Sequence, residues 1–227
     1  SAEFLFALIK EDNTTMDNIT GGVKITSGGT QTDNYCVDIK WSSSNTNVIA
    51  NYGSVTRPAY GEDPLEVTLT ATLSWYSGYD TMAQYGMAEP TVGAMPANRT
   101  VELTLTVQPY TEQEIAAAKA GVEAELAKIT AEMFKESGAS GKDDPAADLS
   151  NVTYDLQLPS SGYGYSDTWS SNNEAITINY LRGKVNRPGI GENDVTGISL
   201  TITITKDGYS ASKTFDNITV KAVTQEE

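Results

Sequence analysis

The feature that most constrains this fold is a pattern that occurs twice along the chain. Each copy contains a tryptophan with a polar run of serine and asparagine, then a Gly-x-Val-x-Arg-Pro segment, and then a glycine followed by an acidic residue. The first copy occupies residues 41–45, 53–58 and 61–63, and the second occupies residues 169–173, 183–188 and 191–193. An internal repeat of this kind indicates structural units of the same type, so two similar domains are expected.

The residues around each copy alternate between apolar and polar side chains, which is the periodicity of a β-strand. Residues 67–73 and 198–204 are the clearest examples. Residues 51–53 (Asn-Tyr-Gly) suit a positive φ angle, so residues 48–49 and 54–56 are expected to form a short hairpin. The proline after each arginine cannot donate to a strand ladder and is expected to end its strand. Short strands separated by frequent turn residues predict a β-sandwich.

The combined pattern resembles the bacterial immunoglobulin-like (Big) domains, and in particular the atrophied type found in tandem on large secreted proteins. The similarity rests on the Trp-Ser-Ser, Gly-x-Val-x-Arg-Pro and glycine elements of both copies, and on Leu158-Pro159 before the second tryptophan. It covers most of both repeats. The resemblance implies a sandwich fold, an extracellular location on a secreted or cell-surface protein, and a larger multi-domain parent. It implies no catalytic activity.

We therefore predict an all-β chain in which two tandem Ig-like β-sandwich domains are joined by one amphipathic α-helix. The expected divisions are an N-terminal segment at 1–17, domain 1 at 18–108 with an insertion at 75–98, a helix and flexible connection at 109–148, domain 2 at 149–223, and a tail at 224–227. Residues 1–10 resemble the end of a helix, because they match the residues that precede repeat 2. A β-strand is the competing interpretation of that segment.

The connecting helix is expected over residues 111–136. Thr111 and Glu114 form a capping box after Pro109, with threonine at the N-cap and glutamate three residues later. Apolar residues recur at three- and four-residue steps and form one stripe. They are Ile115, Ala118, Val122, Leu126, Ile129 and Met133. This stripe is expected to pack on the flank of one or both sandwiches.

Two irregularities are expected in repeat 2. Asp167 stands where repeat 1 has Ile39, so this position is either at a strand edge or marks a slip in register. Phe215 and Ile218 are three residues apart, which breaks the alternation of the last strand. That spacing predicts a β-bulge near residues 216–217.

Composition limits the classes of partner. The chain has 227 residues and a formal net charge of −15, which argues against nucleic acid and anionic lipid surfaces. No apolar run approaches the ~20 residues of a membrane-spanning helix, so no membrane insertion is expected. Residues 4–9 are apolar, but they are too short for a secretion signal and lack its basic flank.

The sequence offers little for catalysis. It contains no histidine, which removes the commonest general base and the commonest metal ligand. Cys36 is the single cysteine, so no intrachain disulfide can form, and its place opposite the Trp41 face predicts a partly exposed thiol without a role. The thirty acidic residues include no motif that selects a pair for acid–base hydrolysis. We predict a protein without enzymatic activity, cofactor or catalytic residues.

Matching acidic loops follow the Arg-Pro element in both repeats, at residues 62–63 and 192–194. Oxygen-rich loops of this kind bind calcium in some secreted β domains. Solvated carboxylates without a metal are the simpler interpretation, and no metal ligands are assigned.

The arginine and the tryptophan that occur in both copies of the pattern are interpreted as structural residues. Arg57 and Arg187 are expected to bond loop carbonyls or an acidic neighbour, although a guanidinium also binds anions. Trp41 and Trp169 are expected in the two cores.

The main asymmetry between the repeats is the insertion between the last two strands of domain 1. A connection this long in a compact domain is usually functional or disordered, and this one contains Trp75, Tyr76, Tyr79 and Tyr85. Exposed aromatic rings stack on sugars and anchor protein partners, so these four residues are the candidate ligand-binding site, for a surface glycan or a protein. The alternative is that they fold back on the sandwich. The leading function is a structural spacer or adhesion module, and a carbohydrate-binding module is the alternative.

Overall fold

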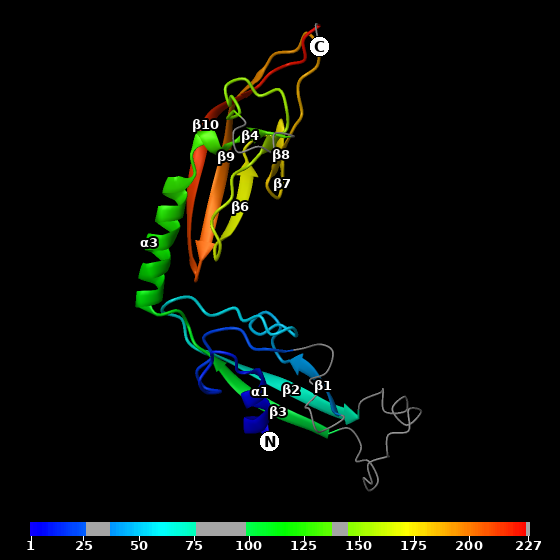
Figure 1. The fold of residues 1–227 in the computed structure, drawn as a ribbon, viewed down its shortest axis with the longest axis vertical. Helices are drawn as coiled ribbons and strands as arrows, with labels where there is room; N and C mark the ends of the chain where they lie inside the picture. Colours follow the sequence, from blue (N-terminus) through cyan, green and yellow to red (C-terminus); the bar gives the residue numbers. More distant parts are fainter. Residues whose placement is uncertain (26–36, 76–98, 138–144, 226–227) are drawn as a thin grey trace. The chain divides into compact units, whose positions relative to one another are not determined.

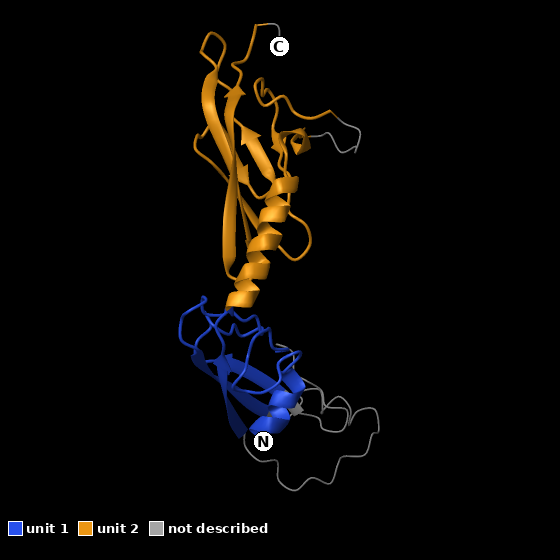
Figure 2. Cartoon of the chain, turned by 90° about the vertical axis from the view of Figure 1, so that its left-hand side faces the viewer, with its two compact units in different colours: residues 1–111 blue, residues 112–227 orange. Residues whose placement is uncertain are grey.

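The computed structural model describes residues 1–25, 37–75, 99–137 and 145–225. The chain divides into two compact units, residues 1–111 (unit 1) and residues 112–227 (unit 2), which Figure 2 shows in different colours. The mainly β architecture and the Ig-like sheets agree with the sequence prediction, and the long helix lies between the two sheet regions along the chain. Within the described residues, no helix combines the length and the apolar character needed to cross a membrane.

Unit 1 is built on one described antiparallel sheet. Its elements are α1 (Ala2–Ile9), β1 (Val37–Ser43), β2 (Leu65–Trp75) and β3 (Arg99–Val107), and the strand order is β1-β2-β3 (Figure 1). Trp41 lies opposite Ala71, which in turn lies opposite Val101. The alternation along β2 and β3 places apolar residues on one buried face, and threonines together with Glu66 and Glu102 on the other. The fully buried residues of these two strands are Val67, Leu69, Ala71, Leu103, Leu105 and Val107.

Helix α1 covers part of this apolar face. Leu5, Phe6 and Ile9 are buried in the same core, and they follow the three- and four-residue spacing that puts side chains on one side of a helix. The side chain of Ser1 accepts a hydrogen bond from the amide of Phe4 at 3.4 Å, as an N-cap residue does. Of the two interpretations of this segment, helix and strand, the structure has the helix.

The expected hairpin of repeat 1 is present and is very short. Ile49 and Val55 form a single antiparallel bridge, and Gly53 adopts a φ of +90° in the turn between them. The amide of Val23 donates to the carbonyl of Gly53 at 2.9 Å, which ties the turn to a neighbouring segment. The equivalent hairpin of unit 2 is longer and forms two regular strands.

The described residues of unit 2 form one α-helix, one short 3-10 helix and two sheets. Its elements are α3 (Glu112–Lys128), η1 (Ala131–Met133), β4 (Lys135–Glu136), β5 (Leu156–Gln157), β6 (Ser166–Ser171), β7 (Ile176–Asn179), β8 (Arg182–Val185), β9 (Val195–Lys206) and β10 (Tyr209–Val220). One described sheet has the order β10-β9-β6, and the other has the order β4-β5-β8-β7. The inner faces of the two sheets share one apolar core.

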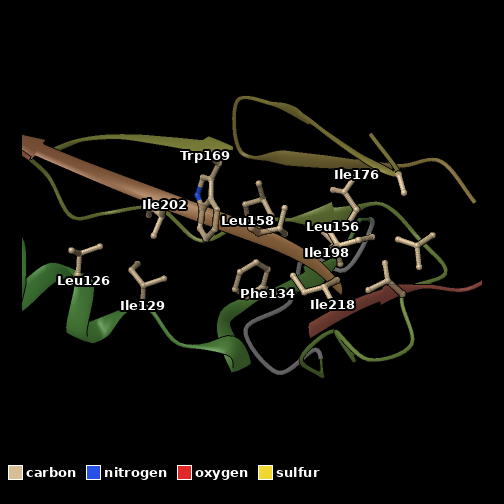
Figure 3. Close-up of a cluster of buried hydrophobic side chains, with 14 of the residues drawn as sticks. Leu126, Ile129, Phe134, Leu156, Leu158, Trp169, Ile176, Ile198, Ile202 and Ile218 are labelled. Atoms are coloured by element: carbon tan, nitrogen blue, oxygen red, sulfur yellow. The ribbon is translucent and has the colours of Figure 1, made fainter. Parts of the chain in front are cut away.

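Figure 3 shows this core, in which Trp169 and Ile202 from one sheet, Leu126 from the last turn of α3 and Ile129 just after that helix surround a common interior. Phe134 is completely buried, and its ring meets the Trp169 ring edge-on with 5.4 Å between centroids. Edge-to-face contacts are a preferred geometry of aromatic pairs. Helix α3 therefore contributes side chains to the core of the sandwich.

Helix α3 is shorter than the sequence prediction, because it ends at Lys128 and not at residue 136. Met133 was predicted on the buried stripe but is 41% exposed. The chain leaves the helix so that Phe134 can enter the core and β4 can pair with β5. Lys213 from β10 donates through Nζ to the carbonyls of residues 126 and 129, at 3.2 and 2.6 Å, and so satisfies acceptors that a helix end leaves free. The helix packs on β9 and β10 of unit 2 (Figure 1).

The structure explains both expected irregularities of repeat 2. Asp167 lies in β6, an edge strand of its sheet, and its carboxylate accepts hydrogen bonds from the amide and the hydroxyl of Ser161 at 2.6 and 2.7 Å. It is therefore an edge residue, and β6 pairs with β9 without a slip. The predicted bulge is confirmed by a register shift between Phe215 and Ile218, with Asn217 at a φ of +62°.

Candidate functional site

The aromatic site predicted for the insertion lies outside the described residues. Tyr76, Tyr79 and Tyr85 all fall within residues 76–98. Trp75 is the last residue of β2, where its backbone pairs with Val37, but its side chain is also outside the described part. The ligand-binding role of these four residues therefore stays a prediction.

The Arg-Pro segment of unit 1 holds the chain where it leaves the sheet. Nε of Arg57 donates to the carbonyl of Gln108 at 3.0 Å, and Nη2 donates to the carbonyl of Pro109 at 2.7 Å. The guanidinium carbon lies 4.3 Å from the ring centroid of Tyr110, within the range of a cation–π contact. The amide of Tyr110 donates back to the carbonyl of Pro58 at 3.2 Å. We call this arrangement the exit clamp.

Unit 2 repeats the exit clamp at the equivalent place. Nε of Arg187 donates to the carbonyl of Lys221 at 2.9 Å, and Nη2 donates to the carbonyl of Ala222 at 2.7 Å. The amide of Val223 donates to the carbonyl of Pro188 at 3.0 Å. The guanidinium is a rigid planar fork with several N–H donors, so it holds two consecutive carbonyls in one orientation. The sequence predicted that both arginines bond loop carbonyls or an acidic neighbour, and the structure shows the bonds to carbonyls.

A tight turn follows each clamp and uses the acidic residue of the pattern. Oε2 of Glu62 accepts from the amide of Ala59 at 2.8 Å, and Oε2 of Glu192 accepts from the amide of Gly189 at 2.6 Å. The glycine before each glutamate has a positive φ, +86° in unit 1 and +83° in unit 2, which glycine adopts without a steric penalty. These two carboxylates therefore close loops of the protein itself.

Unit 2 adds a carboxylate to its clamp. Oδ2 of Asp194 pairs with Nζ of Lys221, and Oδ1 accepts from the amide of Ala222 at 2.9 Å. The hydrogen bond from Lys221, followed by that from the Ala222 amide, lowers the pKa of Asp194 below its ordinary value. Repeat 1 has Pro64 at the corresponding position, so the clamp of unit 1 depends on the ring of Tyr110 for its additional contact.

Asp155 of unit 2 is another carboxylate that makes structural bonds. Asp155 accepts from the amide of Val185 at 2.8 Å and pairs with Arg182, and the bond from Val185 is the main reason that the pKa of Asp155 is lowered. Across residues 1–25, 37–75, 99–137 and 145–225, no three acidic or cysteine side chains are grouped closely enough to hold a metal ion.

The two tryptophans of the pattern belong to the cores, as predicted. Trp169 is 8% exposed, and its Nε1 donates to the carbonyl of Pro159 at 2.9 Å, which explains why Leu-Pro precedes it. Trp41 packs partly buried against the core of unit 1. Its Nε1 is buried and has no acceptor within the described part of the chain. The buried ring of Trp169 is not available as a flat ligand platform.

Sequence reasoning missed the partners of the clamp. The segments that the arginines hold, residues 108–110 and 221–223, follow the last strand of each repeat and carry no motif of their own. The one signal is the Arg-Pro spacing itself, since an arginine fixed by an adjacent proline is placed to bond backbone. The residues Tyr110, Asp194 and Lys221 could be assigned to the clamp only once the strand ends were located.

A comparison with curated proteins finds no match for this chain. The family model of the atrophied bacterial Ig domain matches residues 5–85 and again residues 138–223. The two matched regions contain both copies of the tryptophan-to-Arg-Pro pattern and both clamp arginines, and together they exceed half of the chain. With two such regions and two units built on the same clamp, the chain belongs to the atrophied bacterial Ig domain family and carries two copies of it.

Proposed function

We propose that this chain is a non-catalytic structural spacer of a secreted or cell-surface protein, whose two domains present neighbouring parts of that protein in a set direction. The family supports a structural or interaction role. The single observation that carries the spacer role is the exit clamp, which occurs in both units with the same donors and the same pair of consecutive carbonyls.

The clamp acts on the part of a domain that a spacer needs to control. In unit 1 the held residues, Gln108 to Tyr110, are followed after one residue by Glu112, the first residue of α3. Two charge-assisted hydrogen bonds contribute about 1.5–3 kcal/mol each, enough to keep the segment ordered against the entropy of a few backbone torsions. The clamp thus restrains the backbone of the exit segment within unit 1, and the proposed spacer uses this restraint to set the direction in which the chain leaves the domain.

The test compares two arginine-to-methionine variants. Arg57→Met removes the fork and keeps an apolar stem, while Arg182→Met removes a surface ion pair with Asp155 that is not at an exit. Spin labels are placed at the exposed positions 104 and 196, one in each unit, in a Cys36→Ser background. Double electron–electron resonance then gives the distribution of distances between them.

We expect Arg57→Met to broaden this distribution severalfold, because the exit segment gains freedom while both units stay folded. Arg182→Met is expected to leave the width unchanged. An unchanged width in Arg57→Met, with intact circular dichroism, would refute the spacer mechanism.

A further inference from the structure

One face of the β10-β9-β6 sheet in unit 2 consists entirely of hydroxyl side chains over three consecutive rows. We call it the hydroxyl face. The rows, in register across β6, β9 and β10, are Ser166–Thr205–Ser210, Thr168–Thr203–Ser212 and Ser170–Thr201–Thr214. All nine residues are exposed or half-buried, while the opposite face of the same strands is packed in the core.

Six of the nine hydroxyls of this face are restrained by hydrogen bonds to one another. Those of β9 and β10 are bonded in pairs across the strands, at 2.9 Å for Thr201 and Thr214, 2.8 Å for Thr203 and Ser212, and 2.8 Å for Thr205 and Ser210. Each pair uses one of its two O–H donors, so one donor and several lone pairs per pair remain directed to solvent. Along a strand the rows repeat every ~6.8 Å, and adjacent strands are ~4.8 Å apart.

Unit 1 shows that this chemistry is not a requirement of the fold. Alignment of Trp41 with Trp169 places Lys40 of β1 at the position of Thr168, and Glu102 of β3 at the position of Thr214. Both charged residues are exposed on the outer face of their sheet. Charges on such a face favour solubility and oppose sheet association, and unit 2 has none in the three rows.

We propose that the hydroxyl face of unit 2 binds a neutral polysaccharide laid across the three strands. A regular array of uncharged donors and acceptors complements the hydroxyls of a neutral sugar chain. A polyanionic ligand is disfavoured, because the array supplies no counter-charge and the chain carries a net charge of −15.

The weakness of each single hydrogen bond determines whether the polysaccharide is a soluble or an insoluble one. Each hydrogen bond to the ligand replaces one to water and contributes little by itself. Binding therefore requires many hydrogen bonds at once, which a flat surface of aligned chains supplies and a short soluble oligosaccharide does not. The ligand class is an insoluble neutral polysaccharide.

The test is a depletion assay on the full chain with three solids: microcrystalline cellulose, crystalline chitin and insoluble mannan. The wild-type protein is expected to bind at least one of the three solids and so to be depleted from the supernatant. High salt is expected to leave the bound fraction unchanged. Thr168→Lys/Thr214→Glu introduces the residues that unit 1 already carries at these positions, and is expected to reduce the bound fraction at least tenfold. The reciprocal variant of unit 1, Lys40→Thr/Glu102→Thr, is the matched control and is expected to retain binding.

A second variant guards against misfolding. Thr203→Val replaces the central hydroxyl with a methyl group of similar shape and is expected to weaken binding while thermal unfolding stays as in the wild type. The proposal is overturned if the wild type stays in solution with all three solids, or if the charged double variant binds as well as the wild type. A wild-type dimer that the charged variant dissociates would assign the face to a second copy, and would also overturn it.

Discussion

Replacement of Gly53 by alanine is expected to destabilise unit 1 far more than the same replacement at Gly61. Both glycines have a left-handed backbone, with φ of +90° and +86°, which costs an alanine about 1–2 kcal/mol. They differ in their surroundings. A Cβ at Gly53 would lie 1.8 Å from the carbonyl oxygen of Val23, whereas no atom lies within 4 Å of a Cβ at Gly61.

The clash at Gly53 is with backbone and cannot be relieved by rotating a side chain. The Val23 segment must withdraw by roughly 1.5 Å to restore a normal contact distance. This movement breaks the hydrogen bond from its amide to the Gly53 carbonyl, which contributes about 1 kcal/mol. It also displaces Val23 and Ile25 from the core, for which overpacking costs of about 1–3 kcal/mol are typical. Together these effects total about 3–6 kcal/mol for Gly53→Ala, against about 1–2 kcal/mol for Gly61→Ala.

Equilibrium urea unfolding measures this difference. Tryptophan fluorescence follows the transition, and two-dimensional amide spectra assign it to unit 1, with the transition of unit 2 as an internal reference. The reasoning is refuted if the two variants lose the same free energy of unfolding within about 0.5 kcal/mol, since their backbone strain is matched and only the clash differs.

Three further predictions concern other elements. Asn13, 3% exposed, accepts from two amides and donates to three carbonyls around the α1 loop, so Asn13→Ala should destabilise unit 1 by about 2–4 kcal/mol in the same unfolding assay. The lowered pKa of Asp194 means that its pair with Lys221 stabilises the folded state above the ordinary pKa of ~4 and is lost as the pH falls through the lower folded value. The protection of the amides of residues 221–223 from hydrogen exchange, relative to their intrinsic exchange rate at each pH, should therefore fall on acidification, and Asp194→Asn should abolish that pH dependence. On a glycan array, Trp75→Ala/Tyr79→Ala should lose binding if the insertion is the carbohydrate site, and a variant that binds like the wild type contradicts that assignment.

The spacer function and the polysaccharide binding are proposed for different parts of the protein. The clamp uses charged donors at the end of each domain, and the proposed polysaccharide face uses neutral donors on one sheet of unit 2. Arg57→Met changes the first without touching Thr168 or Thr214, so the two proposals can fail independently.

Much of this protein was determined by local pattern. The twofold repeat, the alternation along β2 and β9, and the bulge at residues 216–217 all follow from spacings of a few residues. Such features can be predicted from sequence because the side chains of a strand alternate between its two faces every two residues, and because a bulge shifts that alternation by one residue. The family resemblance rests on the same short-range spacings.

Tertiary structure decided what depends on partners distant in the sequence. Helix α3 ends at Lys128 because Phe134 enters the core and Lys213, from β10, bonds the last carbonyls. The helical periodicity of the preceding residues continues past that point and contains no information about either partner. The hydroxyl face likewise exists only after register aligns three strands, since serine and threonine alternate on many exposed strands. Local periodicity sets which residues share a face, and long-range packing sets where an element stops and what that face presents.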